Sequence, residues 1–430
     1  MQLKSSLIFI LLIASLVSCK QEVKKTKATE VAVEIPTEIK DHPRDTIASA
    51  TTTRNWLRPP FKYWGIKNVD KLFDTSPIAK GANPVALQNN PVDLSALKIE
   101  QFDGKTYGFV EHLDSNRTDG FLVLHKGKVA YEKYFENMRP SSTHNWFSMS
   151  KSLTGLTADI LAAEGKIDMK KQVLDYLPEL KGTAWEGATV EMVADMLVGI
   201  QYSEAYNDPK SDAYKFAKVS QFVDVPGPPS PYANMAEYFQ TIKKGRNHDE
   251  LFHYVSLNTE LLGLIIKKVT GKLASQVMSE KVWSKIGAEQ DAYVMINSSG
   301  DELVSAAINS TLRDAGRFGQ MMLDDGYYNG KQIVPKEVVA HIKAGGSVEK
   351  FADSKRGKQF KGFNYTRQWW HTDSDAFFAK GLFGQWVYID PSAEVVIVKF
   401  TTSDVPTSTE YDWMNNMNLM REIVAHFENR

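Results

Sequence analysis

Strand-like segments lie toward both ends of this chain, and that placement limits the folds that it can adopt. Residues 120–125 and 129–135 are rich in apolar, β-branched and aromatic side chains and flank a Lys126-Gly127 turn, which predicts a β-hairpin. Residues 381–390 and 395–400 predict two more strands near the other end. This order favours one antiparallel sheet assembled from the two ends of the chain.

The segment between these strands is predicted to be mainly helical. Leu153, Leu156 and Ile160 recur at helical spacing, and Gly165 is placed to end that helix. Helices are also expected at residues 311–325 and 414–427. We therefore predict an α/β (α+β) fold in which a helical lobe, about residues 165–305, is inserted into the lobe that contains the sheet.

The N-terminal residues indicate export. The apolar run from Leu7 to Leu16 is too short to remain as a membrane span. The tetrapeptide Leu16-Val17-Ser18-Cys19 resembles a bacterial lipobox, in which the cysteine becomes the acylated first residue of the mature protein. An ordinary signal peptide with a chance cysteine is the alternative. Cys19 is the only cysteine, so an internal disulfide and a cysteine-based metal site are both excluded.

Residues 20–54 are rich in Lys, Glu and Thr and contain few large apolar side chains, which predicts a disordered tether. The sequence is thus divided into a signal peptide (1–18), a tether (19–54) and a globular domain (55–430). Several acyl chains hold a protein on a bilayer firmly. We expect a lipoprotein of the bacterial cell envelope, anchored to the bilayer with its domain on the periplasmic or outer-surface side.

Charge and motifs argue against several classes of function. The formal net charge is -1, and no basic stripe interleaved with aromatic residues is present, so nucleic acid is not an expected partner. The nine histidines lack the spacing of metal ligands. Neither a zinc-protease helix motif, a phosphate-binding loop nor a strand-linked dinucleotide motif occurs. We expect no metal and no other cofactor.

A serine followed three residues later by a lysine occurs three times, and context separates the three cases. Ser95 to Lys98 and Ser347 to Lys350 lie in polar segments typical of a surface. Ser148-Met149-Ser150-Lys151 instead opens the amphipathic helix described above. Residues three apart on a helix share a face, so Lys151 can reach the Ser148 hydroxyl and serve as its base if its pKa is lowered. The alternative is a serine cap beside a solvated lysine.

Tyr254 and Ser256 form a second candidate pair. They precede the strongly apolar segment 261–266 and are two residues apart in an extended turn, which would point both side chains to one side. A phenol that transfers protons, supported by a neighbouring hydroxyl, fits that arrangement. A packed aromatic residue at the entrance of a helix is the alternative.

Together these residues resemble the serine β-lactamase-like (penicillin-recognising) superfamily, whose motifs are S-x-x-K, then Y-x-N, Y-x-S or S-x-N, then K-T-G or a variant. The similarity extends from about Trp56 to the C-terminus and is greatest to the branch of 6-aminohexanoate-dimer hydrolases and related esterases. It implies that Ser148 is the nucleophile, Lys151 the base or proton relay, and Tyr254 the group that protonates the leaving group. Ser256 matches the last residue of the second motif. Further stretches that share the pattern of this branch are 56–64, 195–200, 204–209, 254–259, 311–319 and 369–370.

The third motif departs from the family pattern. Ala379-Lys380-Gly381 matches its strand, but alanine stands where many relatives carry the cation that engages the carboxylate of a β-lactam or peptide. Lys380 could supply that cation from the next position, although successive strand residues face opposite sides. The resemblance also implies backbone oxyanion donors at Ser148 and Leu382. Tyr206 and Trp370 match positions that line the substrate cleft, with packing as the alternative role.

The predicted activity is that of a serine hydrolase that cleaves an amide or ester bond of a small molecule through an acyl-enzyme on Ser148. A peptidoglycan-directed D,D-peptidase or a true β-lactamase is the alternative enzyme, and Ala379 and Ser256 disfavour it. A catalytically silent binding or sensor lipoprotein is the alternative outside enzymes. The presence of Ser148, Lys151 and Tyr254 together argues against that last reading.

Overall fold

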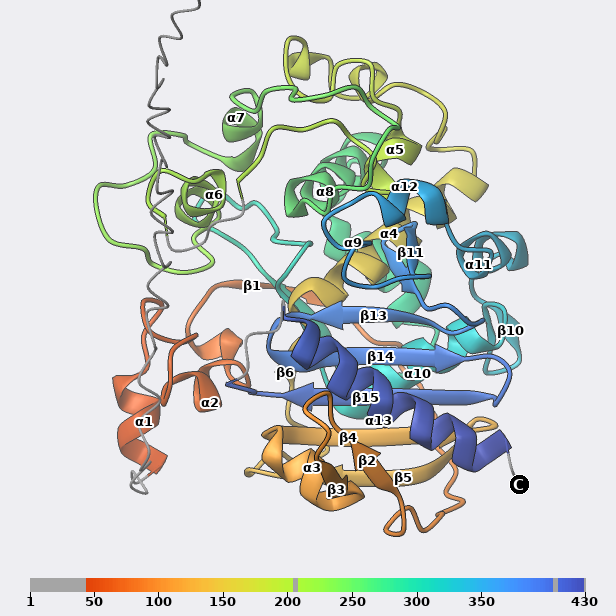
Figure 1. Ribbon diagram of the computed structural model, residues 1–430. Helices are drawn as coiled ribbons and strands as arrows, with labels where there is room; N and C mark the ends of the chain where they lie inside the picture. Colours follow the sequence, from red (N-terminus) through yellow and green to blue (C-terminus); the bar gives the residue numbers. More distant parts are fainter. Residues whose placement is uncertain (1–43, 204–207, 405–408, 429–430) are drawn as a thin grey trace, which may run out of the picture. The chain divides into compact units, whose positions relative to one another are not determined.

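A seven-stranded antiparallel sheet forms the centre of the fold in this computed structural model, which describes residues 44–203, 208–404 and 409–428 (Figure 1). The strand order is β11-β12-β13-β14-β15-β4-β5, so a hairpin from the first part of the chain pairs with strands from the last part. The predicted antiparallel sheet from both ends is therefore confirmed. The strands are β4 (Thr118–His125), β5 (Lys128–Tyr134), β11 (Asn364–Thr366), β12 (Trp369–His371), β13 (Phe377–Gly381), β14 (Gln385–Asp390) and β15 (Val395–Thr401).

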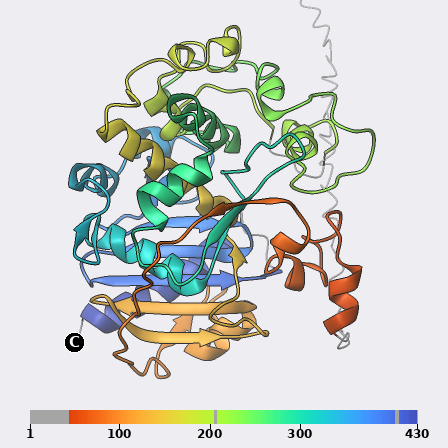
Figure 2. The same cartoon turned by 180° about the vertical axis from the view of Figure 1, so that it is seen from behind.

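Helices cover both faces of this sheet. Leu122 and Leu124 of β4 join the core beneath α10 (Leu312–Leu323), whereas the alternate residues Phe121 and Val123 join the core beneath α13 (Glu410–Glu428). Figures 1 and 2 show α13 crossing one face and α10 lying on the other. Because both faces are covered, seven of the eight β4 residues are buried, and its apolar residues Phe121 to Leu124 are continuous instead of alternating.

The strand predicted over residues 381–390 is interrupted in the structure. β13 ends at Gly381, the 3₁₀ turn η6 covers Leu382–Gly384, and β14 begins at Gln385. Phe383 has a φ of 57° and Gly384 a φ of 85°, which no strand residue adopts. The apolar sequence concealed this turn, which lies at the end of the third motif.

The inserted segment is mainly helical. The fold also contains a second, four-stranded antiparallel sheet of order β1-β7-β8-β6. One of its strands, β7 (Ala292–Met295), lies inside the range predicted as the helical lobe. The helices of this segment are α5 (Val190–Ala194), α6 (Asp212–Ser220), α7 (Met235–Phe239), α8 (Ser256–Thr270), α9 (Ala274–Met278) and the π-helical turn η5 (Ser279–Trp283). The other strands of the small sheet are β1 (Thr75–Ile78), β6 (His144–Asn145) and β8 (Ile308–Ser310).

The remaining elements include α4, which is buried over most of its length, and shorter segments. They are α2 (Lys62–Gly65), η1 (Val69–Lys71), β2 (Lys98–Glu100), β3 (Thr106–Gly108), α3 (Phe109–Ser115), η2 (Phe147–Met149), α4 (Ser150–Ala163), η3 (Val173–Asp175), η4 (Pro178–Leu180), β9 (Tyr327–Tyr328), β10 (Lys331–Gln332), α11 (Lys336–Lys343) and α12 (Val348–Ala352).

The described structure begins before residue 55, the predicted start of the domain. Helix α1 spans Arg44–Ala50. Thr51 is buried and donates its hydroxyl to the Ile47 carbonyl, and Arg54 forms an ion pair with Asp224 at 2.8 Å. Residues 44–54 thus contain a short helix and polar contacts that composition does not reveal, and the boundary of the tether stays a prediction. The predicted signal peptide, Cys19 and the rest of the tether lie outside the described residues.

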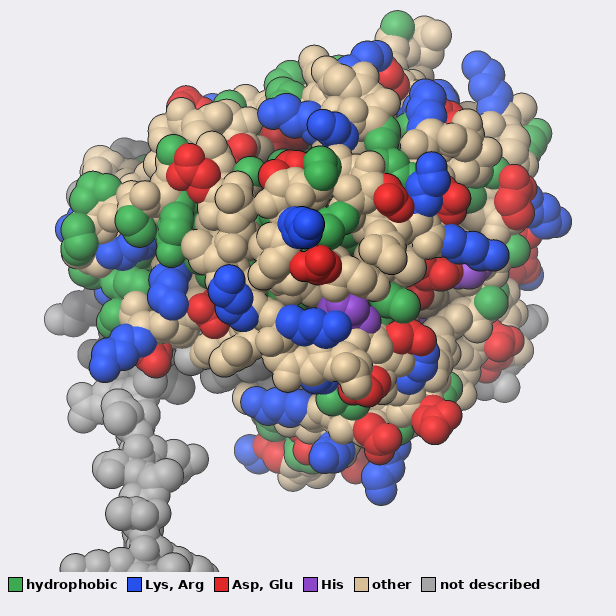
Figure 3. All heavy atoms as spheres, turned by 90° about the horizontal axis from the view of Figure 1, so that it is seen from above, with side chains coloured by type: hydrophobic (Ala, Val, Ile, Leu, Met, Phe, Trp, Pro, Cys, Tyr) green, Lys and Arg blue, Asp and Glu red, His purple; other side chains and the backbone are tan. Residues whose placement is uncertain are grey.

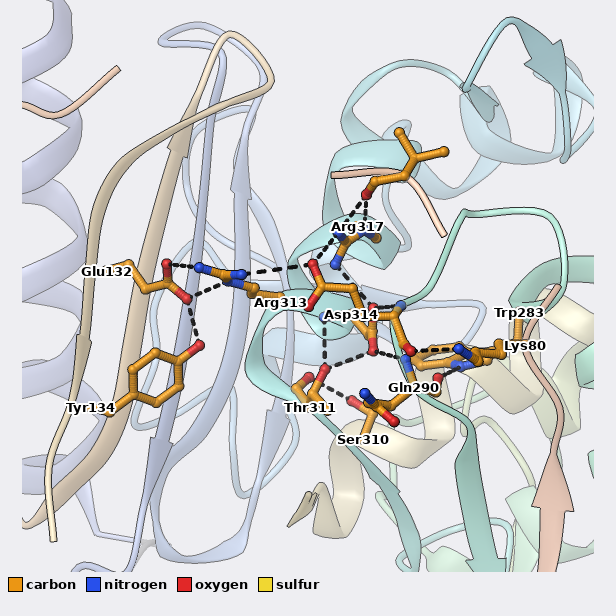
Figure 4. A network of polar contacts seen from close by, with 12 residues as sticks. Lys80, Glu132, Tyr134, Trp283, Gln290, Ser310, Thr311, Arg313, Asp314 and Arg317 are labelled. Carbon is orange, nitrogen blue, oxygen red and sulfur yellow. Dashed lines mark hydrogen bonds and ion pairs between the residues drawn. The ribbon is translucent and has the colours of Figure 1, made fainter. Parts of the chain in front are cut away.

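A buried polar network fixes the start of α10 against both sheets (Figure 4). Thr311 caps the helix by accepting a hydrogen bond from the Asp314 amide, and the Asp314 carboxylate forms an ion pair with Arg317 at 3.0 Å. Arg313 donates two hydrogen bonds, at 2.7 and 2.8 Å, to the carboxylate of Glu132 on β5. The stretch 311–319, which shares the family pattern, thus has a structural role at the start of α10.

Among the described residues, no helix combines the length and apolarity needed to cross a membrane. On the face of the molecule in Figure 3, lysine and arginine side chains are interspersed with aspartate and glutamate. This face therefore presents no extended surface of one charge.

Candidate active site

The turn between β6 and α4 carries Ser148 and is fixed by backbone and side-chain hydrogen bonds. The Trp146 amide donates to the Ile308 carbonyl at 2.8 Å, and its indole donates to the Ser310 hydroxyl at 2.9 Å. The Phe147 amide donates to Asn145 Oδ1 at 2.7 Å, and Phe147 has a φ of 47°. A left-handed phenylalanine is a strained conformation, and such strain is held where the surroundings over-determine it. Ser148 is thereby presented, half-buried, in the 3₁₀ turn η2 that leads directly into α4.

The Lys151 ammonium lies against the Ser148 hydroxyl. Its Nζ is 3.1 Å from Ser148 Oγ and donates to the Ser305 carbonyl at 2.9 Å. The Lys151 side chain is 1% exposed. Only the neutral form of this amine can accept the proton of the serine hydroxyl. The predicted contact between Ser148 and Lys151 is thus present.

Tyr254 approaches the same amine from the turn before α8. The Lys151 Nζ is 5.1 Å from the centroid of the Tyr254 ring. That ring also packs on Trp370, with 5.3 Å between centroids, and on Tyr365 at 5.9 Å. Ser256 is the first residue of α8 and is half-buried. The structure therefore brings together the three residues that the sequence predicted as catalytic.

Glu260 is a further site residue that the sequence analysis did not single out. It lies one turn after Ser256 on α8, is 2% exposed, and accepts hydrogen bonds from the amides of Val304 (3.1 Å) and Ser305 (3.0 Å). Burial raises the pKa of the Glu260 carboxyl to about 7, against hydrogen bonds from Ser305 and the charge of Lys151, which lower it. An acidic residue among the apolar residues of α8 was the available signal.

The third motif lies beside the nucleophile turn, as predicted, but Lys380 does not face it. Lys380 is buried on the α13 side of the sheet, where it forms an ion pair with Asp412 at 3.0 Å and lies 4.8 Å from the ring centroid of Trp413. The prediction that Lys380 binds substrate is therefore wrong, because successive residues of β13 face opposite sides of the sheet. Ala379, on the other face, belongs to the core cluster that contains Phe147.

Gly381 brings the end of β13 against the nucleophile turn. A Cβ at this position would stand 2.1 Å from the Trp146 carbonyl oxygen, so only glycine permits this approach. Leu382 follows and is 42% exposed. The Ser148 and Leu382 amides thus belong to adjoining segments, and the amides at the start of a helix lack intrahelical acceptors. Their role as oxyanion donors stays a prediction.

Of the two residues predicted to line the substrate cleft, one is not described by the structure and the other is buried. Tyr206 lies outside the described residues. Trp370 is 4% exposed and packs between Tyr254 and Trp413, with 4.9 Å between the centroids of the Trp370 and Trp413 rings. Such burial favours the packing role of Trp370, as a support for Tyr254.

The two other serine–lysine tetrads lie on the surface. Ser95 is exposed. Ser347 caps α12 by accepting a hydrogen bond from the Lys350 amide, while the Lys350 ammonium pairs with Asp249 at 2.6 Å. Neither serine has the buried lysine partner that Ser148 has.

Comparison with known proteins assigns the chain to a family. Residues 109–420 match the family described as Beta-lactamase. The chain belongs to this family. It is 31% identical over 367 residues to a 6-aminohexanoate-dimer hydrolase of Paenarthrobacter ureafaciens, a match that covers 85% of this chain and 91% of the relative. This member of the Beta-lactamase family is therefore a serine hydrolase.

Solved structures place this Beta-lactamase family member in the same branch. A Bacillus anthracis protein assigned as a 6-aminohexanoate-dimer hydrolase superposes with a TM-score of 0.81 at 30% identity and covers 89% of this chain and 98% of its own. A family VIII carboxylesterase superposes with a TM-score of 0.57 at 15% identity, covering 74% and 95%. The second similarity shows a shared fold.

Proposed function

We propose that this hydrolase cleaves a linear amide of a small molecule through an acyl-enzyme on Ser148. The observation that carries the proposal is the 3.1 Å contact between the buried Lys151 amine and the half-buried Ser148 hydroxyl, beside the Tyr254 ring. The extent of the similarity to an enzyme named for an amide dimer supports amide as the bond type. Esters are the second expected substrate class, because an ester carbonyl is easier to attack than an amide carbonyl.

The site residues suggest a two-step reaction. Ser148 Oγ adds to the substrate carbonyl carbon while its proton passes to Lys151, and the carbonyl oxygen becomes an oxyanion that the Ser148 and Leu382 amides stabilise. The carbon–nitrogen bond then breaks as the leaving nitrogen takes a proton through Tyr254. Water adds to the resulting Ser148 ester, releases a carboxylic acid and restores the serine hydroxyl.

The third-motif strand supports an acyclic substrate over a β-lactam. Ala379 offers no charge there, and Lys380 is held by Asp412 on the far face of the sheet. A carboxylate adjacent to the scissile bond therefore lacks the cation that this strand supplies in many relatives. The exposed side chain of Leu382 offers an apolar contact instead.

A substrate panel tests this proposal. We expect the purified protein to hydrolyse the linear 6-aminohexanoate dimer and short acyl esters, with nitrocefin turned over far more slowly, and the Ser148→Ala variant to be inactive on all of them. Preferred turnover of nitrocefin would favour a β-lactamase or D,D-peptidase instead. Absence of turnover together with absence of covalent labelling by a fluorophosphonate would favour a binding or sensor protein.

We also propose that the mature protein is a lipoprotein of the bacterial cell envelope, acylated on Cys19. The lipobox-like residues 16–19, the apolar run before them and the polar segment after them support this. Metabolic labelling with palmitate should mark the wild-type protein, and Cys19→Ala should lose the label while its hydrolase activity persists. Equal labelling of both would overturn the proposal.

A further inference from the structure

The segment 303–308 runs between α4 and α8 and connects the catalytic lysine to an acidic residue. From α4, the Thr154 hydroxyl donates to the Val304 carbonyl at 2.9 Å, and the Lys151 amine donates to the Ser305 carbonyl at 2.9 Å. From α8, the Glu260 carboxylate accepts from the Val304 and Ser305 amides. Ser305 is thus held on one side of its Cα by Glu260 and on the other side by Lys151.

The Glu260 carboxylate is unusual for the interior of α8. Its neighbours on the buried face of this helix include Leu257, Leu261 and Ile265. A buried carboxylate is unfavourable unless hydrogen bonds and a nearby positive charge compensate for the loss of water. The two amides supply the hydrogen bonds, and Lys151 supplies the charge, which lowers the pKa of Glu260. An apolar residue of the same size would leave the Val304 and Ser305 amides without these acceptors.

We propose that Glu260 is a positioning residue for the hydrolase reaction: its carboxylate fixes the Ser305 segment that holds the Lys151 amine against Ser148, and its negative charge balances that amine. Lys151 has few ways to shift once the Ser305 carbonyl is fixed, because the same Nζ must also reach Ser148 Oγ. Small displacements of a reacting group can lower a rate about 100-fold.

Several other charged groups lie near the Glu260 carboxyl. Lys151 faces it from α4, and Lys267, one helical repeat further along α8, lines with it a small cavity of about 30 Å³. Asp301 and Glu302 face the same cavity from the loop after β7. Glu302 is a matched control for Glu260, because it too is buried, accepts a backbone hydrogen bond (from the Ser275 amide at 3.3 Å), and has a pKa raised by burial. Its carboxylate contacts α9, whereas that of Glu260 contacts the Val304 and Ser305 amides.

This inference rests on the proposed hydrolase mechanism, but its test does not depend on the substrate. The rate of Ser148 labelling by a fluorophosphonate is measured from pH 5 to 9 by intact-protein mass spectrometry for wild type, Glu260→Gln and Glu302→Gln. Glutamine keeps the size of the side chain and one acceptor but removes the charge and the second acceptor.

Glu260→Gln should label at least ~10-fold more slowly near neutral pH, as expected for a displaced reacting group. Its pH profile should also lose the change near pH 7 at which the wild-type Glu260 carboxyl titrates. Glu302→Gln should keep the wild-type rate and profile.

Two results would overturn the proposal: a wild-type rate and pH profile in Glu260→Gln, or the same slowing and profile change in Glu302→Gln. If Glu260→Gln does not fold, Glu260→Asp replaces it. Aspartate keeps the charge but is one methylene shorter, so it should label slowly with the wild-type pH profile, and a wild-type rate would count against positioning. Wild-type protein that fails to label at all would instead refute the hydrolase proposal itself.

Discussion

The rings of Phe147 and Phe383 meet edge to face, with 5.2 Å between their centroids and an angle of 66° between their planes. Both residues have left-handed backbone conformations, with φ values of 47° and 57°. Phe147 precedes Ser148 and Phe383 follows Leu382, the two residues whose amides are predicted to stabilise the oxyanion. The aromatic contact therefore joins the two strained turns that present these amides.

This contact predicts a loss of transition-state stabilisation when one ring is removed. Phe383→Ala should lower kcat/KM on an ester substrate by about 10- to 100-fold, less than the loss of a whole oxyanion donor. It should also weaken binding of a boronic acid that mimics the tetrahedral intermediate. Phe222→Ala is the control, since Phe222 also touches Phe147, with 6.2 Å between centroids, but belongs to neither turn. Equal losses in both variants would mean that general packing on Phe147 matters, and that the pairing with Phe383 does not.

The sequence predicted the contact of Ser148 with Lys151 because it follows from helical spacing alone, which is local. The turn at 382–384 was missed because apolar residues continue through it, and the close approach of Gly381 to Trp146 that requires it joins residues far apart in the chain. The contacts of the Lys380 side chain could not be predicted from the sequence for a related reason. Alternation puts it opposite Ala379, but the partner that settles its place, Asp412, comes from another element.

The choice among the three serine–lysine tetrads yields a second prediction. Ser148→Ala should abolish covalent labelling by a fluorophosphonate, because Ser148 alone of the three serines has a buried lysine 3.1 Å from its hydroxyl in the described structure. Ser95→Ala and Ser347→Ala should label like wild type, since one is exposed and the other caps a helix. Intact-protein mass spectrometry reads the added mass directly. Persistent labelling of Ser148→Ala would assign the nucleophile to another residue.

The pH dependence of stability can be predicted at His371, which is 4% exposed at the end of β12. Burial lowers the pKa of His371 from 6.5 to about 4. The unfolded chain then binds more protons than the folded chain between these values, so the contribution of His371 to stability is complete above pH 6.5 and is lost as the pH falls toward 4. A shift of this size corresponds to roughly 3 kcal/mol.

His371→Phe removes this titration and keeps a flat ring beside Phe377. Between pH 7.5 and 4.5, the wild type should lose roughly 2 to 3 kcal/mol of unfolding free energy relative to the variant, measured by urea unfolding at both pH values. The wild type must be compared with the variant because other groups also titrate in this range. Burial raises the pKa of Asp159 to about 7, so its contribution to the unfolding free energy increases as the pH falls, opposite to that of His371. Parallel pH curves for the two proteins would contradict the prediction.

The final prediction concerns how Lys151 and Tyr254 share proton transfer. The ammonium contacts both the Ser148 hydroxyl, at 3.1 Å, and the face of the Tyr254 ring, at 5.1 Å from its centroid. Residues that act as one unit give losses far from additive. Lys151→Ala and Tyr254→Phe should each lower kcat/KM by at least ~100-fold, the scale of a positioned acid–base group.

If the two residues form one relay with Ser148, the double variant should be little worse than the poorer single variant, because either substitution already disables the same step. Tyr254→Phe keeps the ring that packs on Trp370 and removes only the hydroxyl, so it separates chemistry from packing. An unchanged rate in that variant would make Tyr254 a packing residue and leave protonation of the leaving group to Lys151. Strictly multiplicative losses would place the two residues in separate steps, so that Lys151 would serve the attack of Ser148 and Tyr254 the departure of the amine.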